Sequence, residues 1–241
     1  MTAAEVNLID GPGTSEDLWR SWIGLRCLPV AQFAGVRSAV VVAAHPDDEV
    51  LGVGGTMALL AAAGCRLRLI AVTDGEGSHP QVDPQVIAAR RVAESAAALR
   101  ALEVGPVEVV RLRLPDTGLG RHEEELAGRL RELCDGFDLC LAPWEFDGHG
   151  DHEAAGRAAL SACGQVMSYP VWMWHWAAPA DPDVPWERAV SVPLPAAAVT
   201  RKAAAIGAFH SQLTSRAGLP GPILPAGFIA HFTRPQEVLF R

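Results

Sequence analysis

The chain alternates short, continuous apolar runs with longer segments in which apolar residues recur every three or four positions. An uninterrupted apolar run predicts a buried strand, because a strand covered on both faces needs no polar alternation. Strands are expected at 40–44, 66–73, 107–114 and 138–143, and helices at 49–63, 84–102, 122–134, 150–163 and 196–210. Strands that alternate with helices predict an α/β fold, here a single Rossmann-like domain with a mostly parallel sheet and helices on both faces.

The ends of the chain are less regular. Residues 1–37 lack clear periodicity and are expected to form an N-terminal extension with one short helix at 17–23, so the domain is taken as 38–241. The Pro-rich stretch 177–195 is expected to form a long surface loop or linker. A strand is expected at 228–232.

Three tryptophans alternate at Trp172, Trp174 and Trp176, a spacing that places three indoles on one face of a strand. Packing in the core or in a subunit contact is the favoured interpretation. A stacking wall for a sugar is the alternative. Exposed tryptophans would favour a homo-oligomer.

Composition narrows the function classes. The 241 residues carry a net charge of −8, and binding to nucleic acid or to an anionic membrane usually requires a basic surface. Five dispersed cysteines without a Cys-x-x-Cys pair predict reduced thiols. Glu5 and Asp10 precede any basic residue, which is unlike a signal peptide. We expect a cytoplasmic protein with a small-molecule partner and without nucleic-acid or membrane partners.

Two clusters of polar residues follow predicted strands. His45, Asp47 and Asp48 come directly after the first strand; acids there are also ordinary capping residues. His149 and His152, with Asp151 between them, follow the strand at 138–143. Since the carboxyl ends of parallel strands share one edge of a sheet, the clusters could converge. Two imidazoles and a carboxylate with open positions suit catalytic Zn²⁺, and the same ligands suit non-haem Fe²⁺.

The motifs Ala-His-Pro-Asp-Asp-Glu at 44–49 and His-Gly-Asp-His at 149–152 resemble the PIG-L/LmbE-like family of zinc-dependent N-deacetylases. The first motif matches fully. In the second, Gly150 stands where family members often have Pro, which leaves the ligands unchanged. Further agreement lies at 73–76, 210–212 and 237–241, so the resemblance covers about residues 38–241.

This resemblance implies a role for each candidate residue. It implies His45, Asp48 and His152 as zinc ligands, Asp47 as general base, His149 as the group that stabilises the oxyanion or acts as acid, and Asp151 as the carboxylate that orients an imidazole. Asp116, Glu76 and Arg91 match positions that contact or line the substrate site. Plainer roles stay open: a turn for Asp116, loop charge for Glu76, and a helix surface or a pair with Glu94 for Arg91.

The expected function is a metal-dependent hydrolase that removes an N-acyl group, such as acetyl, from an amino-sugar-type substrate. Zn²⁺ is the expected cofactor, with Fe²⁺ as the alternative. A deacylase or amidase for a non-sugar natural-product intermediate is a second hypothesis, and a non-haem iron oxygenase with the same ligands a third. A non-catalytic binding protein is disfavoured, because it would be expected to lose Asp47 or His149.

Overall fold

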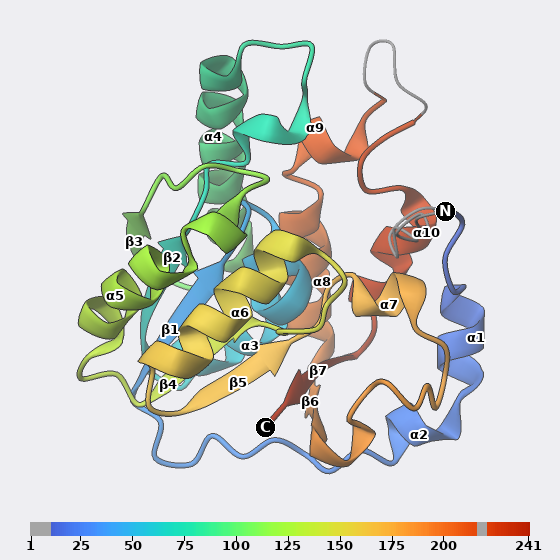
Figure 1. Cartoon of the computed structure of the whole chain (residues 1–241). Coiled ribbons are helices and arrows are strands. Elements are labelled where there is room, and N and C mark those ends of the chain that lie inside the picture. Colours follow the sequence, from blue (N-terminus) through green and yellow to red (C-terminus); the bar gives the residue numbers. More distant parts are fainter. Residues whose placement is uncertain (1–10, 216–220) are drawn as a thin grey trace, which may run out of the picture.

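The structure is a computed structural model that describes residues 11–215 and 221–241; the acidic residues Glu5 and Asp10 lie outside this part. Its strands are β1 (Ser38–Ala43), β2 (Arg66–Ala71), β3 (Glu108–Arg111), β4 (Leu139–Pro143), β5 (Val166–Tyr169), β6 (Ala189–Pro193) and β7 (Gln236–Phe240). They form one sheet in the order β3-β2-β1-β4-β5-β7-β6 (Figure 1).

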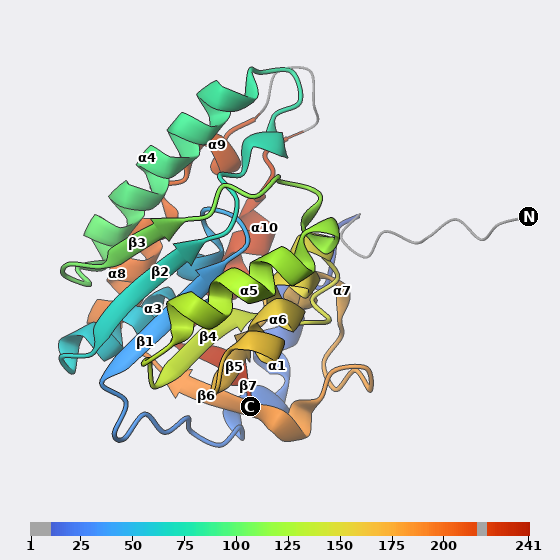
Figure 2. The same cartoon turned by 60° about the vertical axis from the view of Figure 1, so that its left-hand side comes forward.

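The α-helices of the described ranges are α1 (Glu16–Ser21), α2 (Ile23–Arg26), α3 (Asp48–Ala62), α4 (Pro84–Leu102), α5 (Glu123–Cys134), α6 (Gly150–Ala162), α7 (Met173–Trp176), α8 (Ala196–Ile206), α9 (His210–Leu213) and α10 (Ala226–Ile229). Single 3₁₀ turns lie at η1 (Glu76–Ser78), η2 (Leu119–Arg121), η3 (Trp186–Arg188) and η4 (Ala230–Phe232). The long helix α4 runs along the outside of the molecule, beside β3 (Figure 2).

Strand β1 is the centre of the sheet. It pairs in parallel with β2 on one side and with β4 on the other. Strand order therefore reverses between β1 and β4. In open α/β sheets, ligands bind beyond the carboxyl ends of the strands at such a switch point. The two predicted polar clusters follow these two strands.

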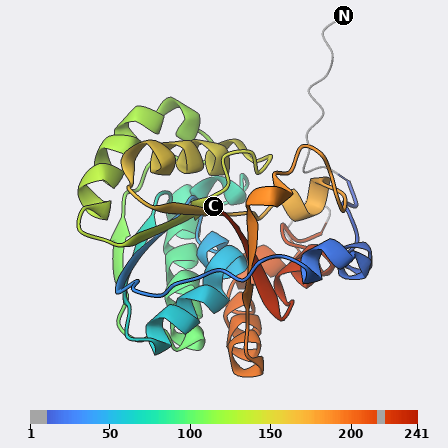
Figure 3. The same cartoon turned by 90° about the horizontal axis from the view of Figure 1, so that it is seen from below.

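Helices cover both faces of the sheet. Alternate residues of β1 point to opposite faces of the sheet and belong to two different hydrophobic cores. Val41 belongs to the core under α3, α4 and α8, whereas Val40 and Val42 belong to the core under α5 and α6. Seen from below, α5 and α6 lie on one side of the strands and α3, α4 and α8 on the other (Figure 3). The prediction of an α/β domain with a mostly parallel sheet is confirmed. Strand β7 is antiparallel to both of its neighbours.

Helix α3 packs closely against β5 at a glycine. A Cβ on Gly52 would lie 2.1 Å from Cδ2 of Tyr169, so a side chain there would force one element away. The backbone of α3 is kinked one residue later, at Val53 (φ −137°). The Glu237 carboxylate of β7 then accepts the N–H groups of Gly55 and Thr56. These contacts fix the helix whose first turn carries Asp48.

The expectation of a strand at the three tryptophans is wrong, because Met173–Trp176 is a single helical turn. The first N–H groups of a helical turn have no partner within the helix. Here the Asp147 carboxylate accepts the N–H groups of Val171, Trp172 and Met173. Trp174 is buried, as the core interpretation predicts.

Two further expectations are wrong. Residues 177–195 contain the buried strand β6, rather than only a surface loop. Residues 228–232 are helical in α10 and η4, which places Phe228 and Phe232 one turn apart in the core. The closing strand is β7, and β5 was not predicted.

Helices α1 and α2 lie within the predicted N-terminal extension. Trp19 of α1 is buried, and its indole N–H donates to the backbone carbonyl of Trp174 (2.9 Å). A boundary at residue 37 stays a prediction. Within the described ranges, every helix is too short or too polar to cross a lipid bilayer.

Candidate metal centre

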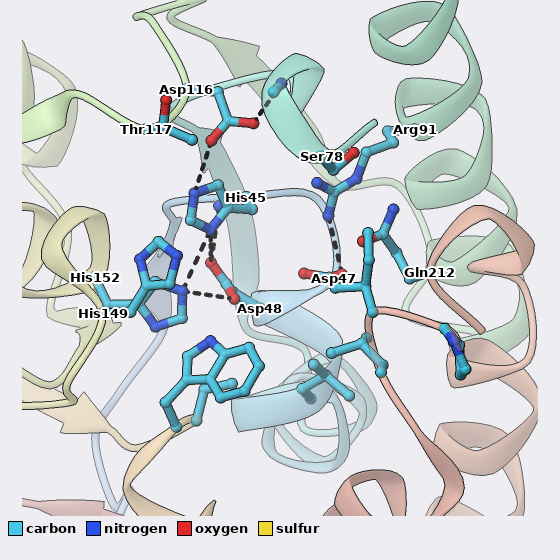
Figure 4. Close-up of a pocket in the computed structure, with 17 residues that line it drawn as sticks. His45, Asp47, Asp48, Ser78, Arg91, Asp116, Thr117, His149, His152 and Gln212 are labelled. Atoms are coloured by element: carbon cyan, nitrogen blue, oxygen red, sulfur yellow. Dashed lines mark hydrogen bonds and ion pairs between the residues drawn. The ribbon is translucent and has the colours of Figure 1, made fainter. Parts of the chain in front are cut away.

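A cavity of about 270 Å³ opens at the carboxyl ends of β1 and β4 (Figure 4). Both polar clusters reach it, so the predicted convergence is confirmed. Its lining also includes segments after β2, β3 and β5 and the segment after α9. The lining residues are His45, Asp47, Asp48, Leu51, Gly77, Ser78, Arg91, Asp116, Thr117, His149, His152, Val171, Trp172, Gln212, Pro222, Ile223 and Leu224.

Three side chains at the base of this cavity present their donor atoms to one point. His45 Nδ1 lies 3.3 Å from His152 Nε2, which lies 3.2 Å from Asp48 Oδ1. Asp48 Oδ2 lies 3.5 Å from His45 Nδ1. Zn²⁺ takes nitrogen and oxygen ligands at 2.0–2.2 Å, and a tetrahedron of that size has edges of about 3.3–3.5 Å. The two imidazole nitrogens have this spacing from each other, and each has it from one of the two Asp48 oxygens, so the donor set suits a Zn²⁺-sized cation.

Both imidazoles are oriented by carboxylates on their far side. His152 Nδ1 lies 2.7 Å from Asp147 Oδ2. His45 Nε2 lies 3.2 Å from Asp151 Oδ2, and the same carboxylate accepts the N–H groups of Thr117 (2.8 Å) and Leu119 (3.0 Å). Carboxylates in this position fix the tautomer of a ligating histidine and raise its basicity.

The centre has an excess of negative charge. Asp47, Asp48, Asp147 and Asp151 are all buried, and Arg91 is the one guanidinium that lines the cavity in the described structure. Burial raises the pKa of Asp48, but the imidazoles of His152 and His45 lower it by more, to well below its usual range. A bound cation would offset buried charge that is otherwise costly.

Asp47 lies in the turn between β1 and α3, in a conformation that is rare for a residue with a side chain (φ 137°). Three contacts hold it there. Its N–H donates to Glu49 Oε2 (3.0 Å), and Arg91 donates both to its carboxylate (2.9 Å) and to the carbonyl of Pro46 (2.7 Å). Burial raises the pKa of Asp47 to about 7, although Arg91 lowers it. Such strain persists only where the surroundings enforce it.

His149 is a neutral imidazole with a defined tautomer. Burial, together with His152 and His45, lowers the pKa of His149 to about 3. The N–H of Asp151 donates to His149 Nδ1 (3.3 Å), so the ring proton resides on Nε2. His149 therefore has one hydrogen-bond donor for a group in the cavity.

The three predicted substrate residues differ in position. Asp116 lines the cavity, with Oδ1 3.2 Å from His45 Nε2 and Oδ2 accepting the N–H of Gly77 (2.7 Å). Arg91 is buried and pairs with Asp47, which rules out the surface position considered for it. Glu76 does not line the cavity; its carboxylate accepts the N–H of Asp116 (3.0 Å).

An apolar wall faces the polar centre. Trp172, Ile223 and Leu224 form part of it, and the Trp172 indole stacks on Phe228 (ring centroids 4.5 Å apart). For Trp172, the sequence favours packing in the core or in a subunit contact, with stacking against a sugar as the alternative. Ile223 and Leu224 carry no local signal, because the path of the chain after α9 brings them to the cavity.

Comparison with known families agrees with this geometry. A family model described as GlcNAc-PI de-N-acetylase (PIG-L) matches residues 40–163, just over half of the chain. The chain belongs to the PIG-L family. The match begins in β1 and ends after α6, so it contains both polar motifs and confirms the resemblance found in the sequence.

Two curated members of similar sequence are deacetylases by name. The diacetylchitobiose deacetylase of Thermococcus kodakarensis is 29% identical over 136 residues, which are 54% of this chain and 50% of that protein. A 1D-myo-inositol 2-acetamido-2-deoxy-alpha-D-glucopyranoside deacetylase of Saccharopolyspora erythraea is 30% identical over 177 residues, 61% of this chain and 64% of that one. The matches span between half and two thirds of these relatives.

Solved structures share the fold. The N,N'-diacetylchitobiose deacetylase of Pyrococcus horikoshii has a TM-score of 0.58 at 20% identity, covering 83% of this chain and 80% of its own. The 4-carboxy-2-hydroxymuconate hydratase GalB of Pseudomonas putida has a TM-score of 0.56 at 21% identity. The match covers 82% of this chain and 83% of the hydratase chain. Because a hydratase has this fold too, fold alone does not decide the reaction.

Proposed function

We propose that the chain is a metal-dependent hydrolase that removes the N-acetyl group of an amino sugar. The observation that carries this proposal is the triangle of His45 Nδ1, Asp48 and His152 Nε2 at the base of the cavity, with the strained Asp47 beside it. Membership in the PIG-L family and the two deacetylase relatives support it.

Zn²⁺ is the ion we propose for this triangle, since two imidazoles and one carboxylate are a common catalytic zinc set. Fe²⁺ suits the same ligands and is the alternative. When bound, such an ion lowers the pKa of water toward neutrality and polarises a carbonyl group. Asp147 and Asp151 would hold the two imidazoles in the ligating orientation.

Asp47 is the residue we assign to proton transfer. Arg91 holds one of its carboxylate oxygens, Oδ2, and thereby fixes the direction of the carboxylate toward the cavity. Asp47 would accept a proton from the attacking water and donate it to the leaving nitrogen. Arg91 would act by positioning Asp47, in addition to any contact with substrate.

His149 would stabilise negative charge on the amide oxygen. Its Nε2 carries the proton, and its ring lines the cavity next to the rings of His45 and His152. A donor that is in place before the reaction costs no reorganisation when the charge develops. The neutral form of His149 suits this task, because Nδ1 accepts the N–H of Asp151 while Nε2 keeps its proton as a donor.

The sugar would lie between Asp116 and the apolar wall of Trp172. Asp116 presents a carboxylate for sugar hydroxyl groups, and an indole face suits the C–H groups of a pyranose. Glu76 would act indirectly, by holding the backbone of Asp116. A cytoplasmic location, the lack of nucleic-acid and membrane partners, and a homo-oligomer stay predictions from the sequence.

Incubation of the zinc-loaded protein with N-acetylglucosamine, diacetylchitobiose and a glucosaminyl-inositol tests the reaction. Hydrolysis of R–NH–CO–CH₃ by water gives R–NH₃⁺ and acetate in equal amounts. We expect both products from at least one substrate, and neither from the Asp47→Asn variant. Acetate with no matching amine, or no turnover of any N-acetylated sugar by metal-loaded protein, would contradict the proposal.

The same experiment separates the rival reactions. A non-sugar N-acyl compound that releases amine, while the sugars do not, would favour the second hypothesis. Addition of water to a double bond would favour hydratase chemistry, for which the GalB fold is a precedent. Oxygen consumption with bound Fe²⁺ would favour an oxygenase.

A further inference from the structure

Three of the five cysteines come together away from the cavity. The Sγ atoms of Cys134, Cys140 and Cys163 lie within 4.8 Å of one another. These residues, the three-cysteine cluster, play no part in the chemistry proposed for the cavity.

Each of these cysteines is fixed by an element of the fold. Cys134 is the last residue of α5, and Cys163 is the C-cap of α6, its N–H bonded to the carbonyl of Ala159. Cys140 lies in β4, between Val40 of β1 and Val166 of β5. The ends of α5 and α6 meet the starts of β4 and β5 on the lower left of Figure 1, at the edge of the sheet opposite the cavity.

One cation lies beside the cluster. Arg68 donates to the carbonyl of Leu133, next to Cys134, through its Nη1, and its guanidinium lies over the Phe137 ring (4.6 Å). The same guanidinium pairs with Glu108 (2.8 Å). Cys134 and Cys140 are buried and Cys163 is half-buried, so an ion could enter from the side of Cys163.

We propose that the three-cysteine cluster binds a thiophilic divalent cation of the Zn²⁺ type, at a second site that ties α5, β4 and α6 together. Thiolates select such soft ions. With Zn–S bonds of about 2.3 Å, ligating sulfurs stand about 3.8 Å apart, which small rotations of these side chains reach from the observed spacing. A disulfide would use two of the sulfurs and leave the third without a role.

Binding would release the three thiol protons to solvent and form three Zn–S bonds, with one position left for water. The ion would join the ends of α5 and α6 to the start of β4. Its role would be structural, since no charged or polar side chain of the substrate cavity reaches the cluster. Amine release by the cavity would continue without it.

Titration of the reduced, metal-free protein with Co²⁺ and Zn²⁺ tests this site. The cavity has only nitrogen and oxygen donors, so thiolate-to-Co²⁺ charge-transfer absorption reports the cluster alone. We expect this absorption in the parent protein and in His152→Ala, and its loss in Cys140→Ala. Cys65→Ala, which removes a buried cysteine outside the cluster, is the matched control and should keep it.

Thiol counting provides a second measurement. Zn²⁺ should protect three thiols of the folded protein from a thiol reagent and leave the exposed Cys27 reactive. Cys163→Ser, at a half-buried helix cap, serves if Cys140→Ala does not fold. Absence of the charge-transfer band, equal thiol reactivity with and without Zn²⁺, or formation of a disulfide without metal uptake would each overturn the proposal.

Discussion

Two buried ionic clusters contact helix α3, and they differ in what surrounds them. The first is the metal centre at the start of the helix. The second joins Lys202 of α8 to Glu237 of β7 (2.6 Å). The Glu237 carboxylate also accepts the N–H groups of Gly55 and Thr56, and Lys202 also donates to the carbonyl of Leu51. The space beside this pair is about 10 Å³, barely enough for a water molecule.

The difference indicates what each cluster is for. At Lys202 and Glu237, one cation meets one anion, and backbone groups of α3 together with the Thr56 hydroxyl make the further hydrogen bonds. At the metal centre, four buried carboxylates meet Arg91 and the imidazoles of His45 and His152, and two of the four, Asp47 and Asp48, face a cavity of about 270 Å³. Balanced buried charge holds elements together, whereas unbalanced buried charge beside a cavity indicates a bound ion.

The largest expected effect is that of His152→Ala. Removing one imidazole leaves two of the three donors, so we expect loss of the ion from the cavity and amine release below detection. Metal content and amine release of the purified variant measure this. His122→Ala, at the N-cap of α5, is the control and should match the parent. Tight retention of the ion by His152→Ala would refute the ligand assignment.

Asp47→Asn should separate catalysis from metal binding. The amide cannot accept the proton of water, and loss of a general base lowers turnover by about 10²–10⁴-fold. Because Asp47 is not one of the three donors, metal content should stay unchanged. Asp83→Asn makes the same change at the N-cap of α4, where it should leave turnover unaffected. Loss of the ion from Asp47→Asn would show that Asp47 is a ligand.

Glu237→Gln tests the balanced cluster. The change leaves Lys202 buried without a counter-charge, for which we expect a loss of about 3–5 kcal/mol in the free energy of unfolding. Chemical denaturation measures it. Metal content should equal that of the parent. A loss below about 1 kcal/mol would place this pair with ordinary surface ion pairs.

The smallest effect is expected at Glu16, which joins α1 to Arg234 (2.9 Å) and His231 (2.8 Å). Burial raises the pKa of Glu16, but His231 and Arg234 lower it by more, to below its ordinary 4.5. Its stabilisation is therefore present above about pH 4.5 and lost as the pH falls further. Glu16→Gln should lower Tm by a few degrees at pH 7 and by much less at about pH 3. An equal change at both pH values would contradict this account.

Local signals account for the parts of the fold that could be predicted from the sequence. The apolar run before His45 needs no tertiary information, and a strand followed by acids predicts both β1 and the first turn of α3. The candidate ligands follow from this, because His45 and Asp48 lie within five residues of the end of β1, and His152 lies nine residues after the end of β4. Their convergence depends on β1 and β4 being neighbours, a topology typical of the fold class.

The rest depends on contacts distant in sequence. The segment around Trp174 has the alternation of a strand, but the Asp147 carboxylate holds it as a helical turn. The spacing of Phe228 and Phe232 is compatible with a strand and with a helix, and only contacts with the rest of the chain decide between them. Ile223 reaches the cavity only through the path of the chain after α9. Arg91 has no local signal of burial, because its partner Asp47 lies in a turn distant in sequence.

The central claim is that unbalanced buried charge at the start of α3 marks an ion site, whereas the balanced pair further along does not. Elemental mass spectrometry of the parent, Asp48→Asn and Glu237→Gln, purified side by side with Zn²⁺ supplied, tests it most directly. We predict that Asp48→Asn carries one ion fewer per chain than the parent, and that Glu237→Gln carries the same number. Full metal content in Asp48→Asn would contradict the account.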